Sequence, residues 1–432
     1  MRDDLFDFSP QRLALVPSND LLFLNRPGSI FVLRISFEVS VCAEPPFKNG
    51  LAALCFRMLM EGTKSRTALE IAQALDDLGC EWNLFGQSLQ IACLSRFQNQ
   101  LLELVGDILQ NSSFEKKRFK KLKTEILEDL KRNYEESENE AFEILRRHVF
   151  FGTKAHAHPL GTVREIQSLS HEELLEFRDR YLGPANLRFY VAGSVDLQSL
   201  QRDLSHSLFG LRHVEAHKPD LMIQTDAQQN DRLFVYRKRQ QSVLCMGHSG
   251  VTRHHPDAVA LKVGDQVFGS GNGLNSRLSR RLREELGLCY SVSGDIMSSA
   301  GRWPGMMQMS IGTAGSTVEQ AVSEMLGCLQ SFLEYGPTEA ETEDTKSYLL
   351  GSQCFLVETC GSLVQLLREM DVFSLSEDFM RQERQKLIGI SASEVRDAWR
   401  RHVSVQRLAF VLVGTVCPSG FSKANRKELL GL

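Results

Sequence analysis

Three side chains in the stretch from Gly50 to Thr63 have the spacing of a metal-binding helix. Ala53, Phe56 and Arg57 stand at i, i+3 and i+4, so a helix would turn all three towards one point that an ion could occupy. These residue types cannot do that chemistry. Alanine and phenylalanine offer no lone pair to a metal, and the arginine guanidinium stays protonated at neutral pH. The stretch predicts the frame of a metal site without its ligands.

The helix that would position these side chains is predicted from its apolar residues. They recur at i, i+3, i+4, i+7 and i+8, the period of a helix that buries one stripe: Leu51, Leu54, Cys55, Met58 and Leu59. Leu33 to Val41 alternates apolar and polar residues, which predicts a strand with one buried face. Phe114 to Phe150 is predicted to form one unusually long helix.

The residues around the three positions resemble a family signature. The pitrilysin/insulinase family of zinc peptidases has Gly-Leu-Ala-His-x-x-Glu-His-Met-Leu-x-x-Gly-Thr, and this chain keeps Gly50-Leu51-Ala52, Met58-Leu59 and Gly62-Thr63 of it. In that family the two histidines bind zinc, and the glutamate is the general base that activates the bound water. The resemblance implies that Ala53, Phe56 and Arg57 replace those groups. We therefore expect no metal and no cofactor in this chain.

Glu125 falls where the family places its third zinc ligand. One carboxylate without two imidazoles holds no zinc at useful strength. We expect Glu125 to be a solvated helix residue that pairs with Arg57 across the former site.

A second family motif lies in the other half of the chain. It consists of Ser276-Arg277-Leu278, Leu282-Arg283-Glu284, Gly287-Leu288 and Cys289-Tyr290-Ser291. In the family, the residues that match Arg283 and Tyr290 reach towards the zinc of another domain. A phenol can donate a hydrogen bond to the oxyanion of the tetrahedral intermediate, and a guanidinium can hold a substrate carbonyl or carboxylate. The alternative is structural, with Arg283 paired to Glu284 or Glu285 and Tyr290 in the core.

A glycine run precedes that motif. Gly269, Gly271 and Gly273 lack the spacing of either nucleotide-binding glycine motif, so we expect a flexible loop that contacts substrate. His156 and His158 stand at i, i+2 in a loop, and the sequence shows no further ligands beside them, so a second metal site is not expected there.

The two halves of the chain end in similar segments. Residues 169–195 align without a gap on residues 390–416, and each segment opens with a capping box, Ser170 with Glu173 and Ser391 with Glu394. Helix, turn and apolar strand follow in both, which favours an internal duplication. We predict an α+β fold with two homologous domains, 1–211 and 232–432, joined by a polar linker, 212–231. Each domain would be a mainly antiparallel sheet with helices packed on one face.

Composition narrows the class of partner. The 432 residues are 42% hydrophobic and 24% charged, with a net charge of -4. This balance favours neither a nucleic-acid partner nor a membrane surface. The ten cysteines include no C-x-x-C pair, and the first residues lack the basic and apolar regions of a signal peptide. These features predict a cytoplasmic protein with reduced thiols.

The resemblance implies a heterodimer. In two-domain members of the family, the zinc domain of one subunit opposes the Arg/Tyr domain of the other. This chain would be the non-catalytic subunit, and a partner of similar size would carry His-x-x-Glu-His, hold the zinc and cleave peptides with it. Two alternatives stay open at this stage: a purely structural subunit like the core proteins of respiratory complexes, and a homodimer that binds and chaperones a precursor peptide.

Overall fold

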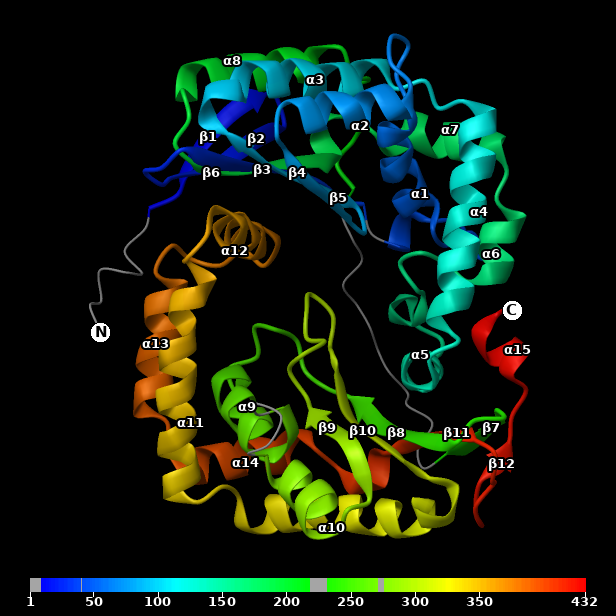
Figure 1. Ribbon diagram of the computed structural model, residues 1–432. Helices are drawn as coiled ribbons and strands as arrows, with labels where there is room; N and C mark the ends of the chain where they lie inside the picture. Colours follow the sequence, from blue (N-terminus) through cyan, green and yellow to red (C-terminus); the bar gives the residue numbers. More distant parts are fainter. Residues whose placement is uncertain (1–8, 40, 218–230, 271–275) are drawn as a thin grey trace. The chain divides into compact units, whose positions relative to one another are not determined.

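The computed structural model describes residues 9–39, 41–217, 231–270 and 276–432 (Figure 1). The chain divides into two compact units, each assembled from three segments of the sequence. Unit 1 consists of Met1–Asp129, His158–Asp220 and Gln353–Phe379. Unit 2 consists of Leu130–Ala157, Leu221–Ser352 and Met380–Leu432. Most of the predicted linker, 212–231, lies outside the described residues.

Unit 1 is built on a six-stranded sheet with the order β1-β2-β6-β3-β5-β4. The strands are β1 (Gln11–Val16), β2 (Asn19–Asn25), β3 (Ile30–Phe37), β4 (Glu81–Phe85), β5 (Ser88–Leu94) and β6 (Leu187–Gly193). Only β2 and β6 run parallel among the neighbouring strands of this sheet. The strand predicted from Leu33 to Val41 overlaps β3, which begins three residues earlier and ends four residues earlier. The prediction of one buried face was wrong, because β3 is central in the sheet and both of its faces are covered.

Unit 2 repeats this arrangement in the order β12-β7-β11-β8-β10-β9. Its strands are β7 (Arg232–Tyr236), β8 (Gln241–Ser249), β9 (Cys289–Asp295), β10 (Met306–Ala314), β11 (Ala409–Gly414) and β12 (Ser422–Lys423). From β7 to β9 the order and the strand directions match those from β2 to β4 in unit 1, and the outermost strands β1 and β12 differ. The predicted α+β fold with mainly antiparallel sheets is confirmed.

The repeated endings are present in both units. In unit 1, α7 (His171–Tyr181) leads into β6, and in unit 2, α14 (Ala392–His402) leads into β11. Both helices begin with the predicted capping box, in which the serine hydroxyl accepts from the backbone of the glutamate and the glutamate accepts from the backbone of the serine. The two copies therefore have the same capping box at the start of the helix that precedes the corresponding strand.

The predicted long helix is two helices. α4 (Lys116–Asn133) ends, three residues follow, and α5 (Ser137–Val149) begins. The prediction of one helix was wrong because no proline or glycine marks the break, and tertiary packing decides it instead. The second half repeats the pair as α11 (Glu339–Ser352) and α12 (Cys360–Val372).

The second helix of each pair packs in the unit that the other half of the sequence builds. α5 belongs to unit 2, where it contacts β8 and β11. α12 belongs to unit 1, where it contacts β6 and β3. In Figure 1, α12 lies on one face of the unit 1 sheet and α3 (Gln98–Asn111) and α8 (Leu197–Phe209) lie on the other. Each sheet is thus completed by a helix exchanged between the two copies.

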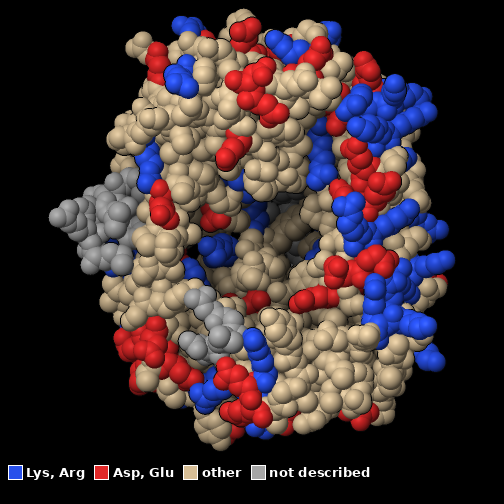
Figure 2. Space-filling model, viewed as in Figure 1, with Lys and Arg blue, Asp and Glu red and all other residues tan. Residues whose placement is uncertain are grey.

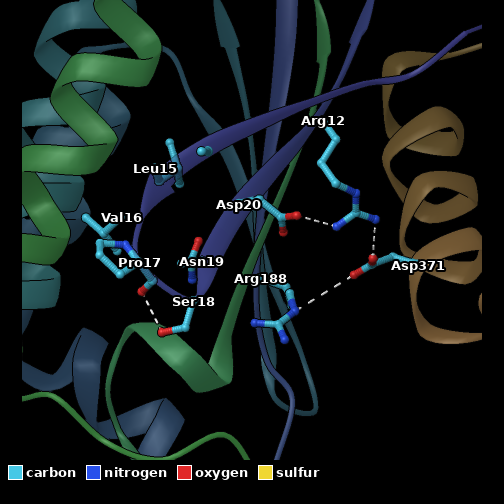
Figure 3. A pocket seen from close by; sticks show the side chains of 10 residues that line it. Arg12, Leu15, Val16, Pro17, Ser18, Asn19, Asp20, Arg188 and Asp371 are labelled. Carbon is cyan, nitrogen blue, oxygen red and sulfur yellow. Dashed lines mark hydrogen bonds and ion pairs between the residues drawn. The ribbon is translucent and has the colours of Figure 1, made fainter.

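α12 buries five apolar side chains, Leu363, Val364, Leu366, Leu367 and Met370, and polar side chains add specific contacts to the sheet. The Tyr190 hydroxyl of β6 donates to Asp371 at 2.9 Å, and Arg12 of β1 donates to the same carboxylate at 2.7 Å. Arg34 of β3 donates to Gln365 at 2.6 Å, and burial lowers the pKa of Arg34 to about 10. Figure 3 shows Arg12 and Asp371 in a cavity at the edge of this contact.

α5 is attached mainly through apolar side chains. Ala141, Ile144 and Leu145 pack in a buried cluster with Val411 and other residues of β7, β8 and β11. One buried charge stands in this contact: the Glu140 carboxylate is bound by Arg237 at 3.1 Å and by Arg426. Both exchanged helices therefore combine a buried apolar face with a few specific polar contacts.

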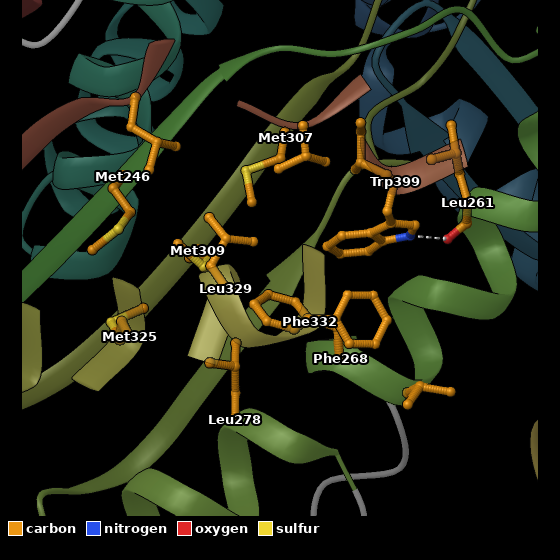
Figure 4. Packing of buried hydrophobic residues seen from close by; sticks show 14 of the residues in the cluster. Met246, Leu261, Phe268, Leu278, Met307, Met309, Met325, Leu329, Phe332 and Trp399 are labelled. Carbon is orange, nitrogen blue, oxygen red and sulfur yellow. Dashed lines mark hydrogen bonds between the residues drawn. The ribbon is translucent and has the colours of Figure 1, made fainter. Parts of the chain in front are cut away.

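The largest buried cluster of unit 2 is centred on three aromatic rings (Figure 4). Trp399 of α14 lies 5.1 Å from the Phe268 ring and 4.7 Å from the Phe332 ring, and its indole N–H donates to the Leu261 carbonyl. The rings join α14 to η7 (Gln266–Ser270) and α10 (Val318–Tyr335), and the hydrogen bond to Leu261 joins α14 to α9 (Ala258–Asp265). This core holds α14 three residues before its end at His402.

The remaining α-helices are α1 (Leu51–Met58), α2 (Ala68–Asp77), α6 (Val163–Ser168), α13 (Phe379–Gly389) and α15 (Arg426–Leu430). Among the described residues, no single helix is long and apolar enough to cross a membrane, and one bent pair, 339–356 with 360–372, passes on length and composition.

Candidate functional site

The backbone at the N-terminus of α1 is fixed by a glycine and a buried carboxylate. Gly50 has φ 99, and a Cβ there would lie 2.7 Å from the Leu160 carbonyl oxygen, so only glycine fits. The buried Glu44 carboxylate accepts from the backbone N–H of Gly50 at 3.0 Å and of Ala52 at 2.8 Å. This satisfies two free donors and places a negative charge at the positive end of the helix. The family frame is preserved in atomic detail.

The former ligand positions are filled by packing. Ala53 and Phe56 are each 1% exposed, and the Phe56 ring stacks on Phe37 with centroids 6.2 Å apart and planes 12° from parallel. A ring that seals the place of the general base excludes the water that the base would activate.

Arg57 completes the replacement with a desolvated charge. Burial lowers the pKa of Arg57, and Asp129 on α4 opposes that effect. Its Nε is buried, and it has no hydrogen-bond partner among the residues that the structure describes. Such a group cannot ligate a metal, and its burial costs free energy.

Glu125 is exposed on α4, as expected, but it does not pair with Arg57. Its carboxylate lies 3.3 Å from the Lys121 ammonium, one turn earlier on the same helix. The expected pairing is wrong because a neighbour at i, i+4 is always within reach on a helix surface. Of the four positions tied to zinc in the family, Glu125 alone carries a metal-ligating group.

Arg283 and Tyr290 are brought together in unit 2. Arg283 lies in the π-helical segment η8 (Ser279–Glu285), which the buried Leu282 anchors, and the chain turns at Gly287 into β9. The Arg283 guanidinium carbon lies 5.0 Å from the centroid of the Tyr290 ring, a cation–π contact. The two residues form one surface element.

The structural alternatives for this pair do not match the geometry. Tyr290 is 79% exposed, so it is not a core aromatic residue. Glu285 lies 3.0 Å from Arg281, and neither Glu284 nor Glu285 forms an ion pair with Arg283 in the described part of the chain. Arg283 faces the ring instead.

Tyr290 stands on an edge strand. β9 is the last strand of its sheet, and its residues Tyr290, Ser291 and Ser293 are exposed. β10 pairs with its inner side, so within the described residues its outer backbone groups are unpaired. An edge of this kind can accept an extended peptide as an added strand.

The glycine run is only partly visible. Gly269 is buried at the end of η7 (Gln266–Ser270), where a Cβ would lie 2.4 Å from the Gly294 carbonyl oxygen of β9. Gly269 therefore allows η7 to lie directly against the strand that carries Tyr290. The expectation that Gly269 belongs to a flexible loop in contact with substrate was wrong, because it is buried in η7. Gly271 and Gly273 lie outside the described residues.

Other residues singled out from the sequence have local roles. His156 Nδ1 lies 2.6 Å from the Thr153 carbonyl oxygen, and His158 Nδ1 accepts from the Leu160 backbone at 3.1 Å. Figure 2 shows Lys and Arg gathered on the side of the molecule where α4 lies. Lys116 of that helix pairs with Glu172 at 3.2 Å, as on a solvated helical face.

One group of polar side chains was missed. His255, Asp257 and His402 of unit 2 offer ligand atoms that all lie within 4.8 Å of one another. His402 is 145 residues from Asp257 in sequence, so spacing gave no signal. Only the packing of α14 against α9 brings the three together.

The duplicated sheets, the exchanged helices and the altered α1 define the class as a peptidase-like α+β fold in which α1 lacks the zinc ligands of the family. The description "Insulinase (Peptidase family M16)" matches residues 27–163, and "Peptidase M16 inactive domain" matches residues 168–349. The chain belongs to the insulinase, or M16, peptidase family.

Known relatives span most of the chain. The uncharacterized zinc protease YmxG of Bacillus subtilis is 26% identical over 74% of this chain and 77% of its own length. The non-peptidase homolog YmxG of Helicobacter pylori is 24% identical over 84% of each. The crystal structure of a peptidase M16 inactive domain from Pseudomonas fluorescens has a TM-score of 0.85 at 19% identity, covering 95% of this chain and 99% of that one. This chain is an inactive-type M16 homologue.

Proposed function

We propose that this chain is the non-catalytic subunit of a heterodimeric zinc endopeptidase. In this assignment its partner is a subunit of similar size with His-x-x-Glu-His, and the zinc is held there. Arg283 and Tyr290 act in trans on peptide bound at the partner's zinc. One relative is named a non-peptidase homolog, which supports the absence of peptidase activity in this chain alone.

A single observation carries the proposal: the exposed Tyr290 pairs with the half-buried Arg283 on an edge strand, in a chain whose zinc positions are closed by Ala53 and Phe56. An exposed phenol on this edge strand adds little to the stability of a purely structural subunit, and Tyr290 is 79% exposed. In a subunit that contributes to another active site, the same exposed phenol can reach the bound peptide.

The chemistry divides between the two side chains. Tyr290 can donate its hydroxyl proton in a hydrogen bond to the oxyanion that develops at the scissile carbonyl. Arg283 stays charged and can hold a carbonyl or carboxylate of the bound peptide. β9 would pair with the peptide backbone and present it to these groups, and Gly269 supports that strand from behind. Gly271 and Gly273 belong to the proposed peptide-binding loop.

The remaining assignments follow from the sequence. We keep 1–211 and 232–432 as the two duplicated domains, joined by 212–231, although each compact unit takes a helix from the other copy. A cytoplasmic location and the lack of nucleic-acid or membrane partners are part of the same proposal.

The experiment mixes this chain with the zinc-bearing partner and measures peptide cleavage. Tyr290→Phe keeps the ring and removes the hydroxyl. It should lower kcat on the order of 10² to 10³-fold and change KM little, because the hydrogen bond forms mainly in the transition state. Arg283→Ala should also raise KM, since a guanidinium binds the ground state too.

Exposed Tyr335 on α10 offers a matched control, and Tyr335→Phe should leave both constants unchanged. Wild-type rates from an assembled Tyr290→Phe complex would overturn the shared site and support a structural subunit. Peptide binding by this chain alone, with no rate effect in any complex, would support a peptide chaperone.

A further inference from the structure

The loop before α9 and the last turn of α14 bring two imidazoles and one carboxylate together in unit 2. His402 Nε2 lies 2.8 Å from Asp257 Oδ2, and His255 Nδ1 lies 3.9 Å from the same oxygen. The two imidazole rings meet edge to face with centroids 4.4 Å apart. All three side chains are partly buried, so their positions are restrained.

We propose that His255, Asp257 and His402 form a binding site for a divalent transition metal such as zinc. The site is in unit 2, whereas the altered peptidase helix α1 is in unit 1. It departs from the expectation, drawn from α1 alone, that this chain holds no metal.

The distances suit one ion. Zinc binds imidazole nitrogen and carboxylate oxygen at roughly 2.0 to 2.2 Å, so two ligands of a tetrahedral site stand about 3.4 Å apart. The observed separations of 2.8 and 3.9 Å lie on either side of that value, and small side-chain rotations would equalise them.

Asp257 is placed for this role rather than for helix capping. It is the N-cap residue of α9, yet its side chain makes no capping hydrogen bond. Against the effect of burial, hydrogen bonds from His402 and Arg401 lower the pKa of Asp257, so it is ionised. Burial and the neighbouring His402 lower the pKa of His255.

Binding would exchange existing contacts. The Asp257 backbone N–H donates to His255 Nδ1 at 3.1 Å, and the metal would take that lone pair instead. The hydrogen-bonded proton between His402 Nε2 and Asp257 would leave to solvent. Arg401, which donates to Asp257 at 3.0 and 3.2 Å, would swing away, and its side chain is exposed enough to do so.

Three protein ligands leave a coordination position for water or for a carboxylate from outside. Asp257 and Arg401 also line an open cavity of about 430 Å³, together with Lys386 and Glu394. The bound metal would therefore join the start of α9 to the end of α14 and remain reachable from solvent.

The test uses the full chain, stripped of metal and titrated with zinc against a coloured chelator, with cobalt absorption as a second readout. The wild type should take up one metal per chain with a tetrahedral cobalt spectrum. His402→Ala and His255→Ala should weaken binding by at least about 100-fold. His254→Ala, next to the site, should leave affinity unchanged.

Two further variants separate a metal site from a hydrogen-bonded cluster. Asp257→Asn keeps the shape and removes the charge, so it should weaken binding even if an alanine variant fails to fold. Arg401→Ala removes the competitor for Asp257 and should leave binding equal or tighter. The proposal is overturned if the wild type binds no stoichiometric metal, or if His254→Ala loses as much affinity as His402→Ala.

Discussion

The α1 region of unit 1 and the β9 region of unit 2 match two motifs of one family, and they are opposite in burial. In α1, Ala53 and Phe56 are each 1% exposed, and packing has replaced the ligands. In β9, Tyr290 is 79% exposed and stands against Arg283 alone. Where a chemical role is lost, the side chains turn to stabilising the fold. The role proposed for Tyr290 requires the opposite, a side chain that stays in solvent and adds little to stability.

The largest contrast is expected in stability. Phe56→Ala opens a cavity beside Phe37 in unit 1 and should lower the free energy of unfolding by about 3 to 5 kcal/mol. Tyr290→Ala removes an exposed ring and should change it by less than about 1 kcal/mol. Urea unfolding followed by circular dichroism compares the two, and similar losses would show that β9 is structural.

A second prediction concerns how the stability of unit 2 depends on pH, through a buried histidine in the sheet that contains β9. His248 of β8 is buried, its Nε2 accepts from the Ser404 backbone, and burial lowers its pKa from 6.5 to about 4. As the pH falls, His248 is protonated near pH 6.5 in the unfolded chain but only near pH 4 in the folded chain. Unit 2 should therefore keep its full stability above pH 6.5. It should lose about 3 kcal/mol as the pH falls to 4.

His248→Gln can accept the same hydrogen bond without titrating. The variant should flatten the dependence of thermal unfolding on pH between 6.5 and 4. An unchanged slope would mean that His248 is not responsible.

The smallest contrast lies within the former zinc site. Arg57→Met removes a desolvated charge whose Nε is unpaired among the described residues, and it should raise the free energy of unfolding by up to about 1 kcal/mol. Exposed Glu125→Gln serves as the control and should stay within about 0.5 kcal/mol. A clear loss in Arg57→Met would show that the attraction to Asp129 outweighs desolvation.

Local sequence patterns predicted several helices and their caps. The capping boxes at Ser170 and Ser391 and the existence of α1 depend on neighbours in sequence, and the structure has all of them. The single buried stripe predicted for α1 was wrong, because every residue of that helix except Arg57 is buried. The break after Asn133, the partner of Glu125 and the group at His402 depend on packing between distant segments. Spacing along the chain carries no information about such contacts. Family resemblance located Arg283 and Tyr290, and only coordinates could show that they touch.

The exchange of α5 and α12 sets an order of events during synthesis. Arg34 of β3 cannot form its hydrogen bond until Gln365 has been synthesised, 331 residues later. At roughly 5 to 20 residues per second, this delay is on the order of tens of seconds. The sheet face that α12 later covers carries Arg34 and the Tyr190 hydroxyl. α5 is synthesised with Ile144 and Leu145 uncovered, before β8 and β11 exist. The nascent chain is therefore expected to expose the apolar, aggregation-prone face of α5 until its last strands leave the ribosome.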